Sequence, residues 1–482
     1  MRILARPGVP EYVQSVTSPY SAAHHIPSGK PRGGRLSCDA QRRASTAPHE
    51  AAPGGLGTTG NLGAKPIGQI GLKPASALGL REMTDSDTGE IFTVKQAKDC
   101  SLQVVQSAAE RRVLRYERKS AAVDALVGLG KSFVSVIGCH VYPISNQQPV
   151  EVWAKRGAAL PGHFRGLQTC ARAWLCPVCA PKIAERRAAE IEAAMATLKA
   201  QGGQVLMPTF TVPHGRNDAL TDTLALIKKA LRSMGQSRKY RDLQTSLGVQ
   251  GRITATEITH GEVNGWHPHF HELWFFELAG IDVVDLELRL YRMWRAACLK
   301  FGLGEPSRKH GVVVQDGSQA AAYVSKLGNK EWSLSDEIAK ASSKGGRRAS
   351  RSAWELLDTI LDTDATPGQQ KRAQGLFREY AEATKGRQQL AWSPGLKKRY
   401  AIAEKDDEEL VAEAEEDAIL LALICPDDWR AIRKQKAQAH VLNAAQFGSD
   451  AVKLVVRHYV SMEGRPPGLG ALTTTSFQQV QS

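Results

Sequence analysis

The sequence lacks any long hydrophobic run. No apolar stretch approaches the ~20 residues that a membrane-spanning helix requires. Residues 1–20 also lack the apolar segment of a signal peptide. We therefore expect a cytoplasmic protein with no membrane partner. Thiols stay reduced in that compartment, so the eight cysteines are better candidates for metal ligands or buried side chains than for disulfides.

The sequence also has fewer acidic than basic residues. The chain has 49 acidic and 63 basic residues and a net charge of +14. This excess favours a polyanionic partner, most simply nucleic acid, because neutralised phosphates release counterions. Binding to a membrane surface is the alternative, but no basic amphipathic helix beside Trp or Phe anchors supports it.

Two basic clusters are candidates for DNA contact. The first contains Lys228, Lys229, Arg232 and Arg238, and the second contains Lys344, Arg347 and Arg348. A solvated charged surface is the alternative for either cluster. No helix-turn-helix signature accompanies them, so sequence-specific recognition of DNA is not assigned to any residue.

The 482 residues are enough for two or three domains. The expected parts are a disordered leader over 1–85, a helical segment over 86–132, a cysteine-rich zinc module and helix over 133–200, a strand-and-helix core over 201–330, a basic helical extension over 331–400, and a charged helical C-terminal region over 401–482.

Periodicity predicts helices over 99–129, 181–200, 220–234, 284–299 and 318–326, and strands over 133–137, 205–212, 252–259 and 312–314. Strands and helices alternating around a β-hairpin indicate an α+β fold with an antiparallel sheet.

Three cysteines with the spacing C-x5-C-x2-C precede the helix expected at Pro181; they are Cys170, Cys176 and Cys179. A C-x2-C pair at a tight turn can give two thiolates to one tetrahedral metal, as structural zinc requires. We predict Cys139 as the fourth ligand, with His140 and His163 as alternatives. Buried thiols without a metal are the other explanation, whereas a redox C-x2-C does not account for the third cysteine.

The most informative segment is Trp266-His267-Pro268-His269-Phe270-His271. Residues two apart on a strand project from the same face, so His269 and His271 would point together. Glu257, on the preceding strand, is the predicted third ligand, and Glu262 ranks second. Two imidazoles and a carboxylate suit Mg²⁺ or Mn²⁺ at a phosphate site and also resemble catalytic zinc. His267 is expected beside these ligands, supporting them or facing substrate, and a polar sheet face that happens to carry histidines is the alternative.

Tyr323 stands in a segment that is otherwise small and apolar, and Lys326 follows it by one helical turn. A phenol beside a metal-polarised phosphate can attack it and form a phosphotyrosine. Lys326 could then stabilise negative charge. An ordinary helix tyrosine packed against the sheet is the alternative.

The order of these motifs resembles that of rolling-circle plasmid replication initiators, the Rep class of the HUH endonuclease superfamily. The similar segments are the cysteine block at 166–187, a strand motif at 209–214, the metal motif at 265–271 and the nucleophile motif at 323–326. The resemblance spans residues 135–410. It implies an HUH-type antiparallel sheet flanked by helices, an inserted zinc-binding module and a mainly helical C-terminal region, with the HUH endonuclease core over 201–330.

The resemblance also implies an activity. Such proteins use the tyrosine to nick a single-stranded origin site, remain on the 5′-phosphate and later rejoin the strand. The implied partners are single- and double-stranded origin DNA, a host helicase and a host polymerase. Gln319 stands where some initiators have an acid that activates water, which leaves Asp316 as the candidate. A single-tyrosine HUH transposase and a non-catalytic, zinc-stabilised DNA-binding protein are the alternatives.

Overall fold

A computed structural model describes residues 80–84, 91–96, 102–105, 108–155, 162–318, 350–412 and 418–462, with side chains from residue 109 onward. All described residues belong to one compact unit, Gly68–Ser482. Apart from residues 80–84, the predicted leader lies outside the described residues.

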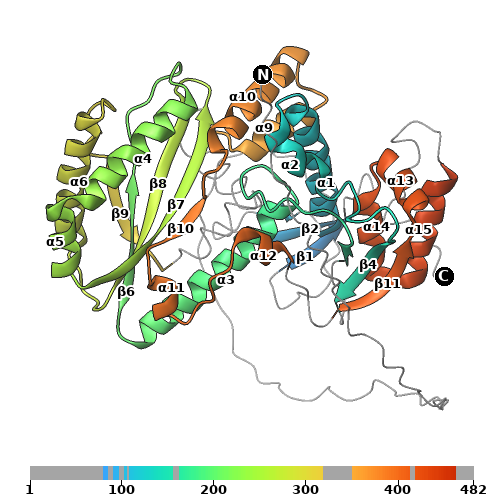
Figure 1. Ribbon diagram of the computed structural model, residues 1–482, viewed down its shortest axis with the longest axis horizontal. Coiled ribbons are helices and arrows are strands. Elements are labelled where there is room, and N and C mark those ends of the chain that lie inside the picture. Colours follow the sequence, from blue (N-terminus) through green and yellow to red (C-terminus); the bar gives the residue numbers. More distant parts are fainter. Residues whose placement is uncertain are drawn as a thin grey trace, which may run out of the picture. The chain divides into compact units, whose positions relative to one another are not determined.

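Among the described residues, the main sheet has five strands in the order β10-β7-β8-β6-β9, and all neighbouring strands are antiparallel (Figure 1). The strands are β6 (Gln204–Phe210), β7 (Val249–Gly261), β8 (Gly265–Phe276), β9 (Val312–Asp316) and β10 (Leu390–Trp392). The predicted antiparallel sheet is confirmed, as are the strands expected near 205–212, 252–259 and 312–314.

Alternating side chains of β8 give the sheet two buried faces. Phe270, Trp274 and Phe276 pack beneath the helices of one face, which are α4 (Leu220–Gln236), α5 (Arg238–Ser246) and α6 (Val283–Lys300). Leu273 and Phe275 point to the other face and pack with α3 (Cys179–Ala200). Because side chains alternate along a strand, His269 and His271 belong to the α3 face, further along β8. The helices predicted over 181–200, 220–234 and 284–299 are confirmed as α3, α4 and α6.

The β7–β8 hairpin closes tightly at Gly261 and Gly265, which face each other in register. Gly265 has φ +72°, and a Cβ at this position would lie 3.0 Å from backbone atoms of Arg216. A side chain there would be strained by its conformation and would collide with that backbone. This turn fixes which residues of β7 lie opposite the histidines.

A second antiparallel sheet has the order β11-β4-β5 and consists of β4 (Val150–Lys155), β5 (Gly162–Arg165) and β11 (Ala418–Ile424). Val150, Val152 and Phe164 point from it into a core shared with the C-terminal helices. These helices are α13 (Pro426–Lys434), α14 (Gln438–Ala444) and α15 (Ser449–Ser461). A third sheet contains β1 (Leu80–Thr84), β2 (Ile91–Gln96) and β3 (Leu102–Val105).

Helices α9 (Ala353–Leu361) and α10 (Pro367–Thr384) pack on each other and on α1 (Ala108–Leu126). The shorter elements are η1 (Lys131–Phe133), α2 (Val134–Gly138), α11 (Leu396–Arg399), α12 (Asp407–Ala412) and η2 (Ala445–Phe447). None of the helices in the described ranges combines the length and apolar character needed to cross a bilayer.

Some predicted elements were wrong. Residues 133–137 form η1 and α2 rather than a strand, because Phe133 and Val136 are buried at helical spacing while Val134 is 60% exposed. The helix expected from residue 99 begins at Ala108, and short strands precede it. Strands β10 and β11 lie in regions expected to be helical. The helix predicted over 318–326 lies outside the described residues except for Ser318.

Candidate functional site

Glu257, His269 and His271 converge on one face of the main sheet. Glu257 lies directly opposite His269 in the hairpin register. One carboxylate oxygen of Glu257, Oε2, is 3.0 Å from His269 Nε2 and 3.2 Å from His271 Nε2. One ligand atom from each residue lies within 4.8 Å of the others. We refer to these three residues as the histidine triad, and their donor set fits one divalent cation.

The outer nitrogens of both imidazoles are occupied. Thr209 Oγ1, on the neighbouring strand β6, is 2.9 Å from His271 Nδ1. The carbonyl oxygen of His267 is 3.3 Å from His269 Nδ1. These contacts leave the two Nε2 atoms for the centre of the triad. Burial lowers the pKa of His271 and so favours the neutral imidazole that binds metals.

His267 lies beside the triad, but its imidazole pairs with His214. Their Nδ1 atoms are 3.2 Å apart and their ring centroids 4.4 Å apart. Burial, followed by the neighbouring His269 and His214, lowers the pKa of His267 to about 4. His214 was not predicted as a site residue, although its position just after the β6 strand was a usable signal.

Two predicted acids lie away from the triad. Asp316 is opposite Leu206, whose side chain lies on the other sheet face from Thr209 and His271. The Asp316 carboxylate accepts hydrogen bonds from Ser318 N and Oγ, so it is not brought to the triad. Glu262 lies in the hairpin turn and pairs with Arg351 at 2.6 Å.

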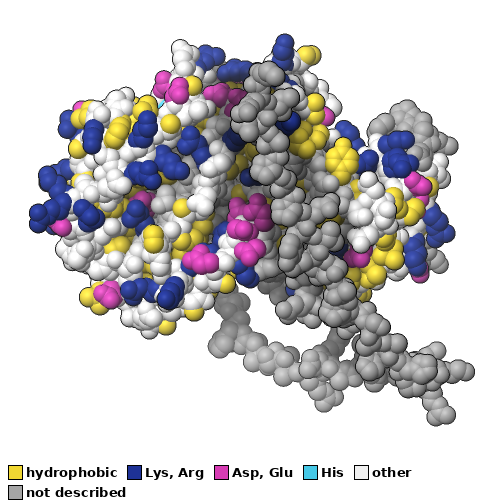
Figure 2. Space-filling view, viewed as in Figure 1, with side chains coloured by type: hydrophobic (Ala, Val, Ile, Leu, Met, Phe, Trp, Pro, Cys, Tyr) yellow, Lys and Arg dark blue, Asp and Glu magenta, His cyan; other side chains and the backbone are white. Residues whose placement is uncertain are grey.

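Several other predicted residues have no described position. Tyr323 and Lys326 lie outside the described residues, as do Lys344, Arg347 and Arg348. The first basic cluster is described. Lys228, Lys229 and Arg232 are exposed on α4, and Arg238 pairs with Asp242 at 3.5 Å. Figure 2 shows lysine and arginine side chains over the surface formed by α4, α5 and α6.

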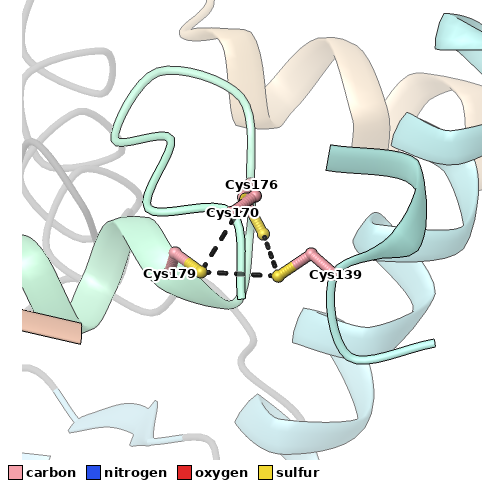
Figure 3. Close-up of side chains that lie close together, drawn as sticks. All are labelled: Cys139, Cys170, Cys176 and Cys179. Atoms are coloured by element: carbon pink, nitrogen blue, oxygen red, sulfur yellow. Dashed lines mark hydrogen bonds between the residues drawn. The ribbon is translucent and has the colours of Figure 1, made fainter. Parts of the chain in front are cut away.

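The four predicted cysteines meet in one buried cluster (Figure 3). Cys139 follows α2, Cys170 and Cys176 lie in the loop before α3, and Cys179 begins α3. The Sγ–Sγ distances are 3.5 Å for Cys139–Cys179, 3.6 Å for Cys139–Cys176 and 3.8 Å for Cys170–Cys179. A disulfide would measure about 2.05 Å, whereas ligands of tetrahedral zinc at about 2.3 Å lie about 3.8 Å apart. The cluster could therefore hold a metal such as zinc.

The alternative zinc ligands do not join this cluster. His140 Nδ1 is 3.1 Å from the Tyr116 hydroxyl, and burial lowers the pKa of His140 to about 4. His163 is on β5, opposite Trp153. The pKa of Cys176 is lowered although burial opposes its ionisation, because the other three thiols and then Lys119 favour the thiolate.

Comparison of the chain with known proteins gives one family match and two curated relatives. Residues 163–280 match a family described as "Replication protein". "Protein rep" of Streptomyces lividans is 28% identical, over 58% of this chain and 76% of the relative. A "Neomycin resistance protein" of Streptomyces cyanogenus is 35% identical, over 24% of this chain and 32% of the relative. No solved structure matches the chain. The first two matches confirm the resemblance to Rep proteins, and the family region contains both the triad and three of the four cysteines.

Proposed function

We propose, from the premise that this chain is a relative of the Rep replication proteins, that it initiates rolling-circle replication of a plasmid. In this proposal it nicks and rejoins single-stranded origin DNA through a 5′-phosphotyrosine intermediate. The observation that carries the proposal is the histidine triad, in which two Nε2 atoms converge on one carboxylate oxygen within the matched region. The five-stranded antiparallel sheet supports assignment to the HUH superfamily.

The triad would hold Mg²⁺ or Mn²⁺, because a carboxylate oxygen and two imidazoles leave further coordination positions for phosphate oxygens. When bound, such an ion polarises the scissile phosphate. The α3 face of the sheet then orients the DNA strand over His269 and His271. His267, held by His214 at 3.2 Å, would line the same face and contact the strand.

Tyr323 would be the nucleophile. Its hydroxyl loses its proton as its oxygen bonds to phosphorus, the bond from phosphorus to the 3′ oxygen breaks, and the leaving oxygen takes up a proton to become the free 3′-OH. Lys326 would stabilise the negative charge that develops on phosphate. Rejoining reverses these steps when a 3′-OH attacks the phosphotyrosine.

The described residues on either side of residues 319–349 support this assignment. Ser318 follows β9, which lies two strands from β8 in the sheet. Arg351 exchanges two backbone hydrogen bonds of 2.8 Å with His260 on β7, the strand on the other side of β8. Ser318 and Arg351 therefore lie on opposite sides of the triad strand β8.

The remaining predicted roles complete the proposal. The cysteine cluster would bind structural zinc, and the two basic clusters would contact DNA phosphates, with Lys344, Arg347 and Arg348 in the second. Single- and double-stranded origin DNA, a host helicase and a host polymerase would be the partners.

A cleavage assay tests the nucleophile and the triad together. Wild-type protein, a single-stranded origin oligonucleotide labelled near its 3′ end and Mn²⁺ should give a covalent adduct that migrates with the protein in denaturing gels. Tyr323→Phe should abolish the adduct while leaving DNA binding intact, and Glu257→Gln should reduce its rate by about 10²-fold or more, since it weakens the metal ligand set. Tyr142→Phe is the matched control because Tyr142 is a 46% exposed tyrosine outside the triad.

Two outcomes would contradict the proposal. An adduct that persists in Tyr323→Phe would show that another residue is the nucleophile. A wild-type protein that binds the oligonucleotide but forms no adduct with Mg²⁺ or Mn²⁺ would instead support a non-catalytic, zinc-stabilised DNA-binding protein.

A further inference from the structure

Lys119 of α1 is a buried cation, with 3% of its surface exposed. Its Nζ donates hydrogen bonds to the carbonyl oxygens of Val136, at 2.7 Å, and Ile137, at 3.4 Å. Across the described ranges, no carboxylate forms an ion pair with it. Carbonyl oxygens satisfy N–H donors but carry no charge to balance an ammonium, and an unbalanced charge is costly to bury.

The cysteine cluster lies next to this ammonium. Val136 and Ile137 are in the last turn of α2, and Cys139 follows that helix directly. The hydrogen bonds of Lys119 therefore hold the segment that presents Cys139 to the cluster.

The charge balance depends on what the cluster contains. Four neutral thiols would leave Lys119 as an uncompensated buried cation. Four thiolates around one divalent metal carry a net charge of −2, which a neighbouring ammonium stabilises. An anionic metal centre would balance the buried charge of Lys119, whereas four neutral thiols would not.

We propose that Lys119 is the counter-cation of a tetrathiolate metal centre formed by Cys139, Cys170, Cys176 and Cys179, and that its charge strengthens metal binding there. This inference rests on the zinc-binding part of the proposed function. Under this inference, tight metal binding requires a positive charge at residue 119 in addition to the four cysteines.

Two substitutions separate the charge of Lys119 from its hydrogen bonds. Lys119→Gln keeps an N–H donor for Val136 and Ile137 but removes the charge, whereas Lys119→Arg keeps both charge and donors. Lys155→Gln is the matched control, because Lys155 is an exposed lysine on β4. The measurements on the full chain are zinc content, the rate of zinc release to a chromogenic chelator, and the thiolate-to-metal absorption bands of the Co²⁺-substituted protein.

We expect Lys119→Gln to release zinc about 10–100-fold faster than wild type, the range for partners that act on metal ligands from outside the coordination shell. Lys119→Arg should release zinc within a few-fold of the wild-type rate, and Lys155→Gln should match wild type. If Lys119→Gln does not fold as purified, the Zn²⁺ concentration at the midpoint of its refolding gives the same comparison, because metal binding and folding are linked.

Wild-type release kinetics in Lys119→Gln would overturn the inference, since Lys119 would then act only as a cap for α2. An equal loss in Lys119→Gln and Lys119→Arg would overturn it too, because geometry and not charge would be responsible. Wild-type protein that contains no zinc and gives no thiolate bands with Co²⁺ would instead refute the zinc site itself, which distinguishes the two failures.

Discussion

At the scale of single residues, the orientation of each imidazole in the triad depends on a neighbour that is not itself a ligand. A ring nitrogen that is hydrogen-bonded on the outer side leaves the other nitrogen for the metal and restricts rotation of the ring. For His271 this neighbour is Thr209, and for His269 it is the backbone carbonyl of His267. Only the Thr209 contact can be removed by a side-chain substitution, because the His267 contact is made by a backbone carbonyl.

Thr209→Val should weaken metal binding at the triad. Valine has nearly the shape of threonine but has no hydroxyl, so His271 Nδ1 loses its partner at 2.9 Å. We expect the affinity for Mn²⁺ to fall about 10–100-fold, measured from the electron paramagnetic resonance signal of free Mn²⁺. Thr209→Ser, which restores the hydroxyl, should recover most of the affinity, and equal affinities in Val and wild type would mean that the contact does not orient His271.

The sequence was sufficient to predict some site residues and not others. Glu257 could be predicted because a tight hairpin determines the residues that face each other across it, and Glu257 lies opposite His269. The partners of Thr209 and His214 were not predicted, because they depend on pairing between β6 and β8, segments more than fifty residues apart in the chain. Local periodicity contains no information about such pairing.

At the scale of elements, α6 illustrates how the sheet is covered on the face away from the triad. Leu286, Leu290 and Trp294 of α6 are buried in the core that it shares with β8. The N-cap residue of the helix is Asp282, whose carboxylate accepts hydrogen bonds from Val284 N at 2.9 Å and Asp285 N at 3.1 Å. Those N–H groups have no partner within the helix, so the side chain stabilises its first turn.

Asp282→Ala should lower the free energy of unfolding by about 1 kcal/mol, the usual cost of losing an N-cap. Asp282→Asn should retain most of that stability, because its side-chain oxygen still accepts the hydrogen bonds. Urea unfolding followed by tryptophan fluorescence measures both changes. If the alanine variant is as stable as wild type, α6 does not depend on this cap.

Elements with one clear period were predicted well, and short apolar runs were not. The helices α3, α4 and α6 have sustained helical spacing, and they appear where that spacing predicted them. The run at 133–137 and the run that forms β11 are both short and apolar, and periodicity alone cannot assign such runs to a strand or a helix. Their conformations are decided by distant partners, which for β11 is pairing with β4.

At the scale of the whole molecule, the cysteine cluster and the histidine hairpin share a hydrophobic core. The core around Cys139 and Cys176 also contains Ile258 of β7 and Trp266 of β8. Tyr380 of α10 links the two regions, since its ring centroid is 6.0 Å from that of Trp174 in the cysteine loop and 6.1 Å from that of Trp266. A metal that stabilises the cluster would therefore also stabilise the hairpin that presents His269 and His271.

In the proposed function, the net charge of +14 would make the affinity for DNA depend on the whole surface and not on the triad alone. Each phosphate neutralised by a lysine or arginine releases counterions, so the logarithm of the binding constant for duplex DNA should fall linearly with the logarithm of the salt concentration. If Lys228 and Lys229 of α4 contact phosphates, each contributes about 0.9 to the magnitude of that slope.

We therefore expect Lys228→Ala combined with Lys229→Ala to reduce the slope by about 2, and to weaken binding to specific and unrelated duplexes equally. Fluorescence anisotropy titrations over a series of salt concentrations measure this slope. Lys371→Ala is the control, because Lys371 is exposed on α10 and belongs to neither basic cluster. A double variant with an unchanged slope would exclude α4 from the DNA-binding surface, whereas a loss confined to origin sequences would mean that these lysines contact bases as well as phosphates.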